Sequence, residues 1–517
     1  MKEVGELKEA VERGLAFLRT QEDIESAQVF VSANGRLWTR LNYTSHIPCN
    51  ALEEPKSTED YGIGIQAVFK TPEGRKIGFG SEERDITLEG VRIALRKARE
   101  GAVIDPEFYC LPRPIAEERT LFDYHDREIM EISEDDFVAA GWKTLDGAID
   151  VFANSEELRR LGERLQDLGL IVGGDLTILQ EGMAVGSYEM PEAQSDESTL
   201  ILAYLTAMVE ERDAKGSGYS VHLKLKDLGD EAARTAAQNA IDSINGIRIP
   251  SGDYAVILGP QPTAELFGGL VVPSCRLSSF YAQQSAFMGR LGKQVASDIL
   301  TVVDRGNVPG LNGSKGITCE GLPTGETILI KDGVLTGLLA DWYENQRILN
   351  DPKAKEKLGV DPKDWQQAIV PRSGFRFARG GGRNFGITPH ASATNVLFEC
   401  PQASDFGTLV AQVEKGILVG RLWYTYPVHG LEKGDFTGTL TADSYLIEDG
   451  KITAPIKVNT LRISDNIHNV LMGIQGISKE TKPTILWAAD EIIYAPQGVL
   501  VEKVHLDQIA EFMEETY

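Results

Sequence analysis

The segment from Asp253 to Tyr343 constrains the fold more than any other part of the chain. It opens with an uninterrupted apolar run from Tyr254 to Leu258, followed by a Gly-Pro-Gln-Pro sequence and then by apolar residues at helical spacing over 263–272. A short continuous apolar run is typical of a buried strand, and apolar residues three or four apart are typical of a helix. Pro262 suits the first turn of that helix, because its missing N–H would have had no partner there. The segment therefore predicts a strand, a turn and a helix.

Further signatures follow in the same segment. Residues 291–297 (LGKQVAS) and 300–304 (LTVVD) come first, then 320–324 (EGLPT), and finally 328–335 (ILIKDGVL). In the last of these, two apolar runs flank Asp332-Gly333, which is a hairpin signal. Taken in this order, the signatures resemble the TldD/PmbA family.

The likeness extends over most of the chain. Outside the segment it rests on Gly62-Ile63-Gly64-Ile65-Gln66-Ala67, Gly78-Phe79-Gly80-Ser81, Asp105-Pro106-Glu107-Phe108, Leu111-Pro112, Gly434-Asp435-Phe436 and 446–452 (LIEDGKI). Each motif is weak alone, but their order and spacing together are specific.

The active members of that family are zinc peptidases with a His-Glu-x-x-x-His motif on the helix after the first strand. The matching residues here run from Ala264 to Gly269 (AELFGG), so both histidines are missing and only Glu265 is kept. Neither an alanine nor a glycine side chain offers a lone pair to a metal. We expect no metal at this helix, and the chain resembles the PmbA branch, also called TldE, that lacks the histidines. Glu265 is a weak catalytic candidate, and its simpler interpretation is a solvated helix residue.

The spacing of the family motif also predicts an irregular helix. Five residues advance an α-helix by about 500°, which is about 140° past a full turn. Two ligands at that spacing need a distorted or terminating helix, and Gly268-Gly269 provides the flexibility for one.

A second weak catalytic candidate is His429. No two of the seven histidines stand three, four or five residues apart, so the sequence has no local chelating pair. His429 lies shortly before Gly434-Asp435-Phe436, and the resemblance places the matching segment of the family close to its active centre. We therefore select His429 as a catalytic candidate and Asp435 as a substrate-binding candidate. The simpler interpretation of His429 is a loop histidine bonded to the backbone.

Arginines surround Gly374 and the glycine run 380–382: they are Arg372, Arg376, Arg379 and Arg383. Backbone N–H groups and bidentate guanidinium contacts can bind a phosphate or a carboxylate. We predict Arg376, Arg379 and Arg383 to bind substrate, with a flexible or interface loop as the alternative. The glycine run lacks Walker spacing and the following Ser or Thr, which excludes a nucleotide triphosphatase of that type.

The hydrophobic pattern predicts an α+β protein of three domains, because 517 residues are too many for one ordinary core. Residues 1–111 show a helix, two strand segments and a helix, which indicates an N-terminal α+β domain with a mixed sheet. Residues 112–245 combine helical and strand patterns in a central domain. Residues 246–517 form a large β-rich C-terminal domain that resembles that of the family. The segments 112–136 and 350–383 are longer than the family pattern, and their role stays open.

Composition and charge limit the classes of partner. Hydrophobic residues make up 42% and charged residues 25%, as in folded globular proteins. The formal net charge of −25 opposes binding to a phosphate backbone, so we expect no nucleic-acid partner. The five cysteines are scattered without CxxC spacing, which favours a reducing compartment and no disulfide framework. There is neither a secretion signal at the N-terminus nor a run of about 18 apolar residues, so we expect a cytoplasmic protein without a membrane partner.

The resemblance leaves three functions open. The first is a non-zinc subunit of a metallopeptidase complex that cleaves unfolded or small peptides; such a subunit carries no cofactor and pairs with a TldD-like zinc subunit or with a second copy of itself. The second is a self-sufficient hydrolase or modifying enzyme that uses the same cavity with altered chemistry. The third is a non-enzymatic scaffold that captures extended peptides by strand addition. The cavity of the family forms between two subunits, which implies a dimer in each case.

Overall fold

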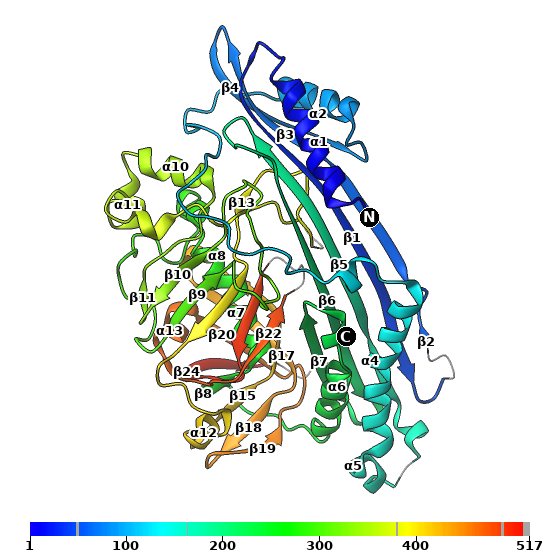
Figure 1. Ribbon diagram of the computed structural model, residues 1–517. Helices are drawn as coiled ribbons and strands as arrows, with labels where there is room; N and C mark the ends of the chain where they lie inside the picture. Colours follow the sequence, from blue (N-terminus) through cyan, green and yellow to red (C-terminus); the bar gives the residue numbers. More distant parts are fainter. Residues whose placement is uncertain (48–50, 163, 379–380, 487–490, 510–517) are drawn as a thin grey trace.

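A long N-terminal sheet and a β-rich C-terminal part make up the computed structural model, which describes residues 1–47, 51–162, 164–378, 381–486 and 491–509 (Figure 1). The sheet has seven strands in the order β4-β3-β1-β5-β6-β7, with β2 beside β1, and all of its pairings are antiparallel. Its strands are β1 (Ile24–Thr44), β2 (Ala51–Leu52), β3 (Lys56–Thr71), β4 (Gly74–Glu83), β5 (Leu170–Ser187), β6 (Gln194–Val209) and β7 (Ala214–His222).

Helices cover one face of this sheet, and the C-terminal part covers the other (Figure 1). The covering helices are α1 (Val4–Leu18), α2 (Leu88–Glu100), α4 (Glu134–Asn154) and α6 (Glu231–Asp242). Glycines in the strands let two of them approach closely. A Cβ atom at Gly80 would lie 2.2 Å from the carbonyl oxygen of Ala94 in α2, and one at Gly218 would lie 1.9 Å from that of Ala232 in α6. The opposite face, called the inner face below, is the one that meets the C-terminal part.

Strands from both sides of residue 112 belong to this one sheet. β1 pairs with β5 from Gln28↔Ser187 to Thr44↔Ile171. The predicted boundary at residue 112 therefore does not separate two sheets, because hydrophobic periodicity identifies strands without telling which of them pair. The division of the chain into three domains stays a prediction.

The C-terminal part contains two larger sheets, and the predicted α+β class with a β-rich C-terminal region is confirmed. The nine-stranded sheet has the order β16 (Arg421–Pro427), β17 (Asp435–Ala442), β20 (Leu461–Asn466), β24 (Val499–Gln508), β8 (Gly252–Leu258), β15 (Lys415–Val419), β18 (Tyr445–Glu448) and β19 (Lys451–Pro455), with β21 (Ile474–Ile477) beside β24. The six-stranded sheet has the order β11 (Val334–Leu335), β10 (Glu326–Lys331), β9 (Thr301–Arg305), β14 (Asn395–Glu399), β23 (Ile492–Pro496) and β22 (Thr481–Ile485).

The predicted strand, turn and helix are confirmed at the start of the C-terminal part. β8 is followed by α7 (Pro260–Leu266), with Pro262 in its first turn. The chain continues as a π-helix over Phe267–Val271 and then as α8 (Val272–Ser274). The hairpin predicted at Asp332-Gly333 is the connection between β10 and β11.

The remaining elements are short. They are α3 (Arg127–Met130), α5 (Glu156–Arg160), α9 (Leu277–Tyr281), α10 (Trp342–Asn350), α11 (Ala354–Leu358), α12 (Phe406–Ala411), α13 (Ile467–Met472), and the strand pair β12 (Gly374–Phe375) and β13 (His390–Ala391). No helix in the described part of the chain is both long and apolar enough to cross a membrane.

An aromatic cluster joins the inner face of the sheet to the C-terminal part. Phe30 and Met183 lie on the sheet side, and Phe375, Phe377 and Phe385 lie on the C-terminal side, all of them buried. The rings of Phe375 and Phe377 stack with their centroids 4.8 Å apart. Through this cluster the inner face of the sheet packs against the C-terminal part.

Candidate functional site

A cavity of about 410 Å³ lies between helix α7 and the inner face of the N-terminal sheet. Pockets for small ligands usually have volumes of about 300 to 1,000 Å³, so this one is large enough for a ligand. The sheet contributes Leu179, Leu202, Tyr204, Tyr219 and Val221, and the C-terminal part contributes Gln261, Glu265, Trp423 and 484–486. The segment that organises the C-terminal part therefore lines a space shared with the N-terminal sheet.

Glu265 lines this cavity from the last turn of α7, and only 7% of its surface is exposed. The interpretation of Glu265 as a solvated helix residue is wrong, because α7 is covered by β16, β22 and β23. Burial raises the pKa of its carboxyl group to about 7, although the Arg421 guanidinium opposes the shift. Near neutral pH the group is therefore divided between its protonated and ionised forms.

Gln261 connects Glu265 to the edge of the nine-stranded sheet. Its side-chain amide donates to Glu265 Oε1 (2.9 Å) and to the carbonyl oxygen of Leu422 (3.1 Å), and its Oε1 accepts from the Leu422 N–H (2.9 Å). β16 is an edge strand of its sheet, and among the described residues no strand pairs with its free side. The Gln261 amide makes hydrogen bonds to the backbone of β16 like those that a neighbouring strand would make, and its third hydrogen bond holds the Glu265 carboxyl next to β16.

The helix changes its geometry directly after Glu265. α7 ends at Leu266 and the π-helix follows, which confirms the expected distortion. Single turns of π-helix often occur at functional sites. Ala264 is fully buried, whereas Gly269 is exposed and a Cβ atom there would meet no atom within 4 Å. The chain thus offers a methyl group at position 264 and no side chain at position 269.

The donor set around Glu265 does not fit a zinc ion. A zinc site needs three or four nitrogen, sulfur or oxygen ligands, and on this helix neither Ala264 nor Gly269 offers one. In the described ranges no group of three or more His, Cys, Asp or Glu side chains is arranged to hold a metal ion. Cys110, Cys275, Cys319 and Cys400 are free, and Cys49 lies outside the described residues.

Stacked tyrosines form the sheet side of the cavity. The rings of Tyr204 and Tyr219 have centroids 6.1 Å apart and planes 15° apart. The Arg421 guanidinium lies 4.8 Å from the centroid of Tyr204, and the Lys482 ammonium lies 4.0 Å from that of Tyr219. The Tyr219 hydroxyl is 2.8 Å from the Thr484 hydroxyl. Cations of the C-terminal part therefore hold both rings by cation–π contact.

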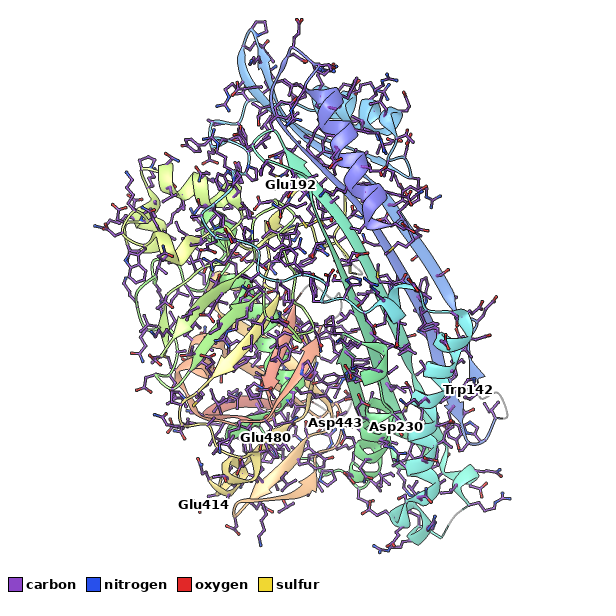
Figure 2. The ribbon with its side chains drawn as sticks, viewed as in Figure 1. Trp142, Glu192, Asp230, Glu414, Asp443 and Glu480 are labelled. Carbon is purple, nitrogen blue, oxygen red and sulfur yellow. The ribbon has the colours of Figure 1, made fainter. Side chains whose placement is uncertain are left out.

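Beside these tyrosines, a buried carboxyl group joins the C-terminal part to the N-terminal sheet. Asp443 lies where the C-terminal part meets the N-terminal sheet (Figure 2), and it accepts hydrogen bonds from the backbone N–H and the hydroxyl of Ser217. Burial raises the pKa of Asp443 to about 6, and the Ser217 hydrogen bonds oppose this shift. Asp443 and Ser217 together anchor β7 next to the cavity.

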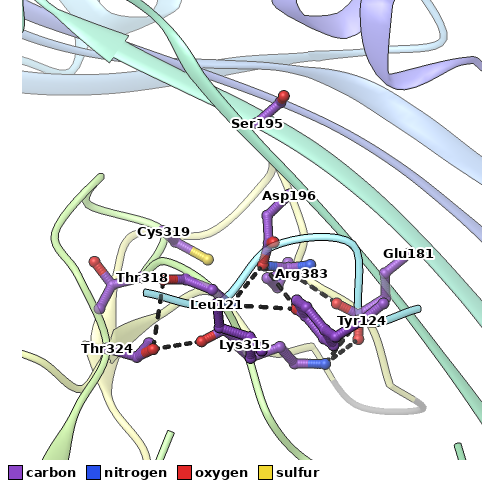
Figure 3. Close-up of polar contacts among 12 residues, drawn as sticks. Leu121, Tyr124, Glu181, Ser195, Asp196, Lys315, Thr318, Cys319, Thr324 and Arg383 are labelled. Carbon is purple, nitrogen blue, oxygen red and sulfur yellow. Dashed lines mark hydrogen bonds and ion pairs between the residues drawn. The ribbon is translucent and has the colours of Figure 1, made fainter. Parts of the chain in front are cut away.

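Arg383, a predicted substrate-binding residue, belongs to a buried charge cluster (Figure 3). Its Nε donates a hydrogen bond to Glu181 Oε2 and its Nη1 donates one to Asp196 Oδ2, each with a donor–acceptor distance of 2.7 Å. Lys315 donates a hydrogen bond of 3.1 Å to Glu181, and the Tyr124 hydroxyl donates one of 2.9 Å to Asp196. Burial works against ionisation, but Lys315 and Arg383 lower the pKa of Glu181. The cluster joins the sheet to the C-terminal part, and a substrate could contact Arg383 only if these pairs separated.

Arg376 has no exposed surface either. Its backbone N–H donates to Cys319 Sγ (3.3 Å), its Nη1 donates to the carbonyl oxygen of Ile387 (2.5 Å), and its guanidinium lies 4.7 Å from the ring centroid of Phe30. Burial lowers its pKa to about 10. Arg379 lies outside the described residues. A substrate-binding role for these arginines stays a prediction, and neither Arg376 nor Arg383 lines the cavity beside Glu265.

The structure brings His429 and Asp435 together at the surface. His429 Nδ1 is 3.2 Å from Asp435 Oδ2, and 70% of the histidine side chain is exposed. The interpretation of His429 as bonded to backbone is wrong, because its ring nitrogen contacts a carboxylate. Asn466 donates to Asp435 over 2.9 Å, and Asn466 and His429 together lower the pKa of Asp435. Neither His429 nor Asp435 lines the cavity that contains Glu265.

Sequence reasoning missed four residues of the site: Gln261, Tyr204, Tyr219 and Arg421. Gln261 could have been found, because it stands four residues before Glu265, and residues at this spacing meet on one helix face. The other three come from strands far away in the sequence, and nothing local indicates that they meet α7.

Residues 251–508 match the PmbA/TldA metallopeptidase C-terminal domain. A metalloprotease TldD homologue from Haemophilus influenzae is 30% identical over 235 residues, which cover 44% of this chain and 42% of that protein. A metalloprotease from Methanothermobacter thermautotrophicus is 24% identical over 269 residues, or 51% of each chain. The chain thus matches about half of the length of these two relatives. TldE from Thermococcus kodakarensis shares the fold, with a TM-score of 0.76, 17% identity and coverage of 96% of this chain and 100% of that one.

Proposed function

The chain belongs to the PmbA/TldD family, and we propose that it is the non-zinc subunit of a metallopeptidase complex that cleaves unfolded or small peptides. One observation carries the proposal: the helix after β8 keeps its place and Glu265, but positions 264 and 269 offer no metal donor. The subunit has no cofactor of its own, and the zinc ion belongs to its partner.

The preserved surroundings of α7 support a binding role. The strand, helix, π-helix and hairpin of the segment all keep their order, and the cavity beside Glu265 is open to a ligand. A chain that had merely lost its function would have had no reason to keep a hydrogen-bonded Gln261–Glu265 pair in a buried position, where an unpaired polar group costs stability. We infer that the cavity holds part of a peptide while the partner supplies the hydrolytic chemistry.

The partner is a TldD-like zinc subunit or, in a homodimer, a second copy of this chain. The proteins similar to this chain include both a TldD homologue and a TldE, which supports a pair of unlike subunits. The net charge of −25 argues against a nucleic acid as a further partner. We place the complex in the cytoplasm, because the described cysteines are unpaired.

Reconstitution tests this function. The chain is purified together with a TldD-like zinc subunit from the same genome, and cleavage of unstructured peptides is followed with both subunits, with each alone and after zinc chelation. Cleavage that needs both subunits and zinc is expected. If the zinc subunit cleaves equally well without this chain, the proposal fails. Peptide binding without any turnover in the complex would favour a scaffold instead.

A self-sufficient enzyme is the second candidate, and the environment of Glu265 favours it. A carboxyl group with a pKa of about 7 inside a cavity suits general acid or base chemistry at neutral pH. The purified chain is screened for turnover of peptides and small amides, with Glu265→Gln as the comparison. No turnover by the wild type, or turnover that survives Glu265→Gln, would exclude this candidate.

A further inference from the structure

The cavity beside Glu265 has mainly apolar and aromatic walls. Leu179 and Leu202 lie on one side of it with Tyr204 and Tyr219, and Trp423 lies on the other. An apolar group that enters such a space removes its own surface and that of the walls from water, which stabilises the complex in proportion to the area buried. Leu202 and Tyr204 are only partly buried in the free chain, so a ligand has surface left to cover.

The charged groups of the cavity do not favour an ionic ligand. Arg36 and Asp175 have opposite charges, and Asp175 also pairs with Arg40 over 3.4 Å. Glu265 is attracted to the Arg421 guanidinium behind it. An ammonium or carboxylate group that entered among Leu202, Tyr204 and Trp423 would lose its water, which costs free energy. A carboxylate could recover part of that cost at Arg36, whose side chain is exposed and whose guanidinium lies 5.1 Å from the ring centroid of Trp38. The cavity therefore selects against ions.

Hydrogen-bonding capacity remains at Glu265. Both amide hydrogens of Gln261 are occupied, by Glu265 and by the carbonyl oxygen of Leu422. The Glu265 carboxyl accepts from Gln261 at Oε1 and has acceptor sites to spare, since a carboxylate offers about four. A ligand for this cavity thus combines a neutral apolar group with a hydrogen-bond donor beside it.

We propose that the cavity binds one large uncharged residue of a peptide, aromatic or branched aliphatic, and that Glu265 accepts a hydrogen bond from an adjacent backbone N–H. A volume of about 410 Å³ is near the lower end for ligand sites and suits one residue with its flanking peptide groups. The inference rests on the proposed function and names the side-chain class that the subunit selects.

Binding of blocked tripeptides to the full-length chain tests this inference. The peptides are acetyl-Ala-Xaa-Ala-amides with Phe, Leu, Ala, Lys or Glu at the central position, and their affinities are measured by isothermal titration calorimetry at a pH about one unit above the pKa of Glu265, where its carboxyl group is ionised. The Phe and Leu peptides are expected to bind at least ten-fold more tightly than the other three. Equal affinities across the series, or preference for Lys or Glu, would overturn the inference. Binding of free p-cresol or indole without binding of the Phe peptide would also overturn it, because the ligand would not be a peptide.

Variants at Leu202 locate the site. Leu202→Trp fills the cavity and is expected to reduce affinity for the Phe peptide at least ten-fold. Leu88→Trp makes the same change on the exposed surface of α2 and leaves binding unchanged. Leu202→Ala serves if the larger side chain prevents folding: it widens the cavity and is expected to increase the preference for Phe over Leu. Binding by Leu202→Trp at wild-type strength, in a protein with wild-type circular dichroism, would refute the assignment.

The outcomes also separate this inference from the proposed function. Selective peptide binding by a chain that gives no partner-dependent cleavage leaves the inference standing and rejects the function. Partner-dependent cleavage that is the same with Leu202→Trp leaves the function standing and rejects the inference.

Discussion

Glu265 makes the free energy of unfolding depend on pH. Burial raises the pKa of its carboxyl group from 4.5 to about 7, so the folded protein holds this proton at pH values where the unfolded chain has released it. The stability that the protonated group provides is fully present below about pH 4.5 and is lost as the pH rises through about 7. With about 1.4 kcal/mol per pKa unit, the total loss is about 3 kcal/mol.

Glu265→Gln removes this titration while keeping the shape of the side chain. Relative to the wild type, the variant is expected to gain about 1 kcal/mol at pH 5.5 and about 3 kcal/mol at pH 9, so the gap widens by about 2 kcal/mol. Unfolding entropy grows with chain length, and for 517 residues 1 kcal/mol corresponds to a Tm change of about 1 °C. Differential scanning calorimetry is therefore expected to show a Tm gap that widens by about 2 °C.

Glu12→Gln provides the matched control. It makes the same chemical change on the exposed face of α1, so its Tm gap to the wild type is expected to stay constant between pH 5.5 and pH 9. Any fixed cost of fitting an amide beside Gln261 cancels in the comparison of the two pH values. A Glu265→Gln gap that stays constant or narrows as the pH rises would refute the reasoning about burial.

Three further substitutions test the contacts around the site. Arg383→Met removes a buried charge-assisted hydrogen bond from Glu181 and another from Asp196, although Lys315 and Arg119 remain as counter-charges. It is expected to lower the free energy of unfolding by about 3 to 5 kcal/mol in urea, whereas Arg13→Met at an exposed pair changes it by less than about 1 kcal/mol. Gln261→Ala removes the side-chain amide that bonds the backbone of β16. It is expected to lower the free energy of unfolding by about 1 to 3 kcal/mol and to speed backbone hydrogen exchange in β16. Unchanged exchange would contradict the role of the amide. His429→Ala is expected to change stability by less than about 1 kcal/mol, because the pair is exposed, and a larger loss in the same assay would show a buried role.

Local pattern was sufficient for much of the fold. The apolar run of β8, the proline in the first turn of α7 and the Asp332-Gly333 hairpin all form from residues close together in sequence. The absence of a metal-donor side chain at Ala264 and Gly269 is also a local property, since no surrounding structure can give a lone pair to a methyl group or to a hydrogen atom. The α+β class followed from the same periodicities.

The environment of each candidate side chain could not be predicted in this way. Arg383 is a plausible anion-binding residue in its glycine-rich segment, yet its partners Glu181 and Asp196 are about two hundred residues away on β5 and β6. Glu265 has the pattern of a solvated helix residue, yet three strands cover its helix. Pairing of distant elements sets burial and counter-charges, and periodicity contains no information about such pairing.

The sequence by itself determined the strand and helix around Glu265 and the absence of a donor side chain at positions 264 and 269, because both properties depend on residues within a few positions of each other. Only the tertiary structure decided that Glu265 is buried, that Gln261 fixes it to an edge strand, and that tyrosines from β6 and β7 complete an apolar cavity around it. The physical reason is that a cavity consists of surfaces from several elements, and its chemistry exists only when folding brings those surfaces together.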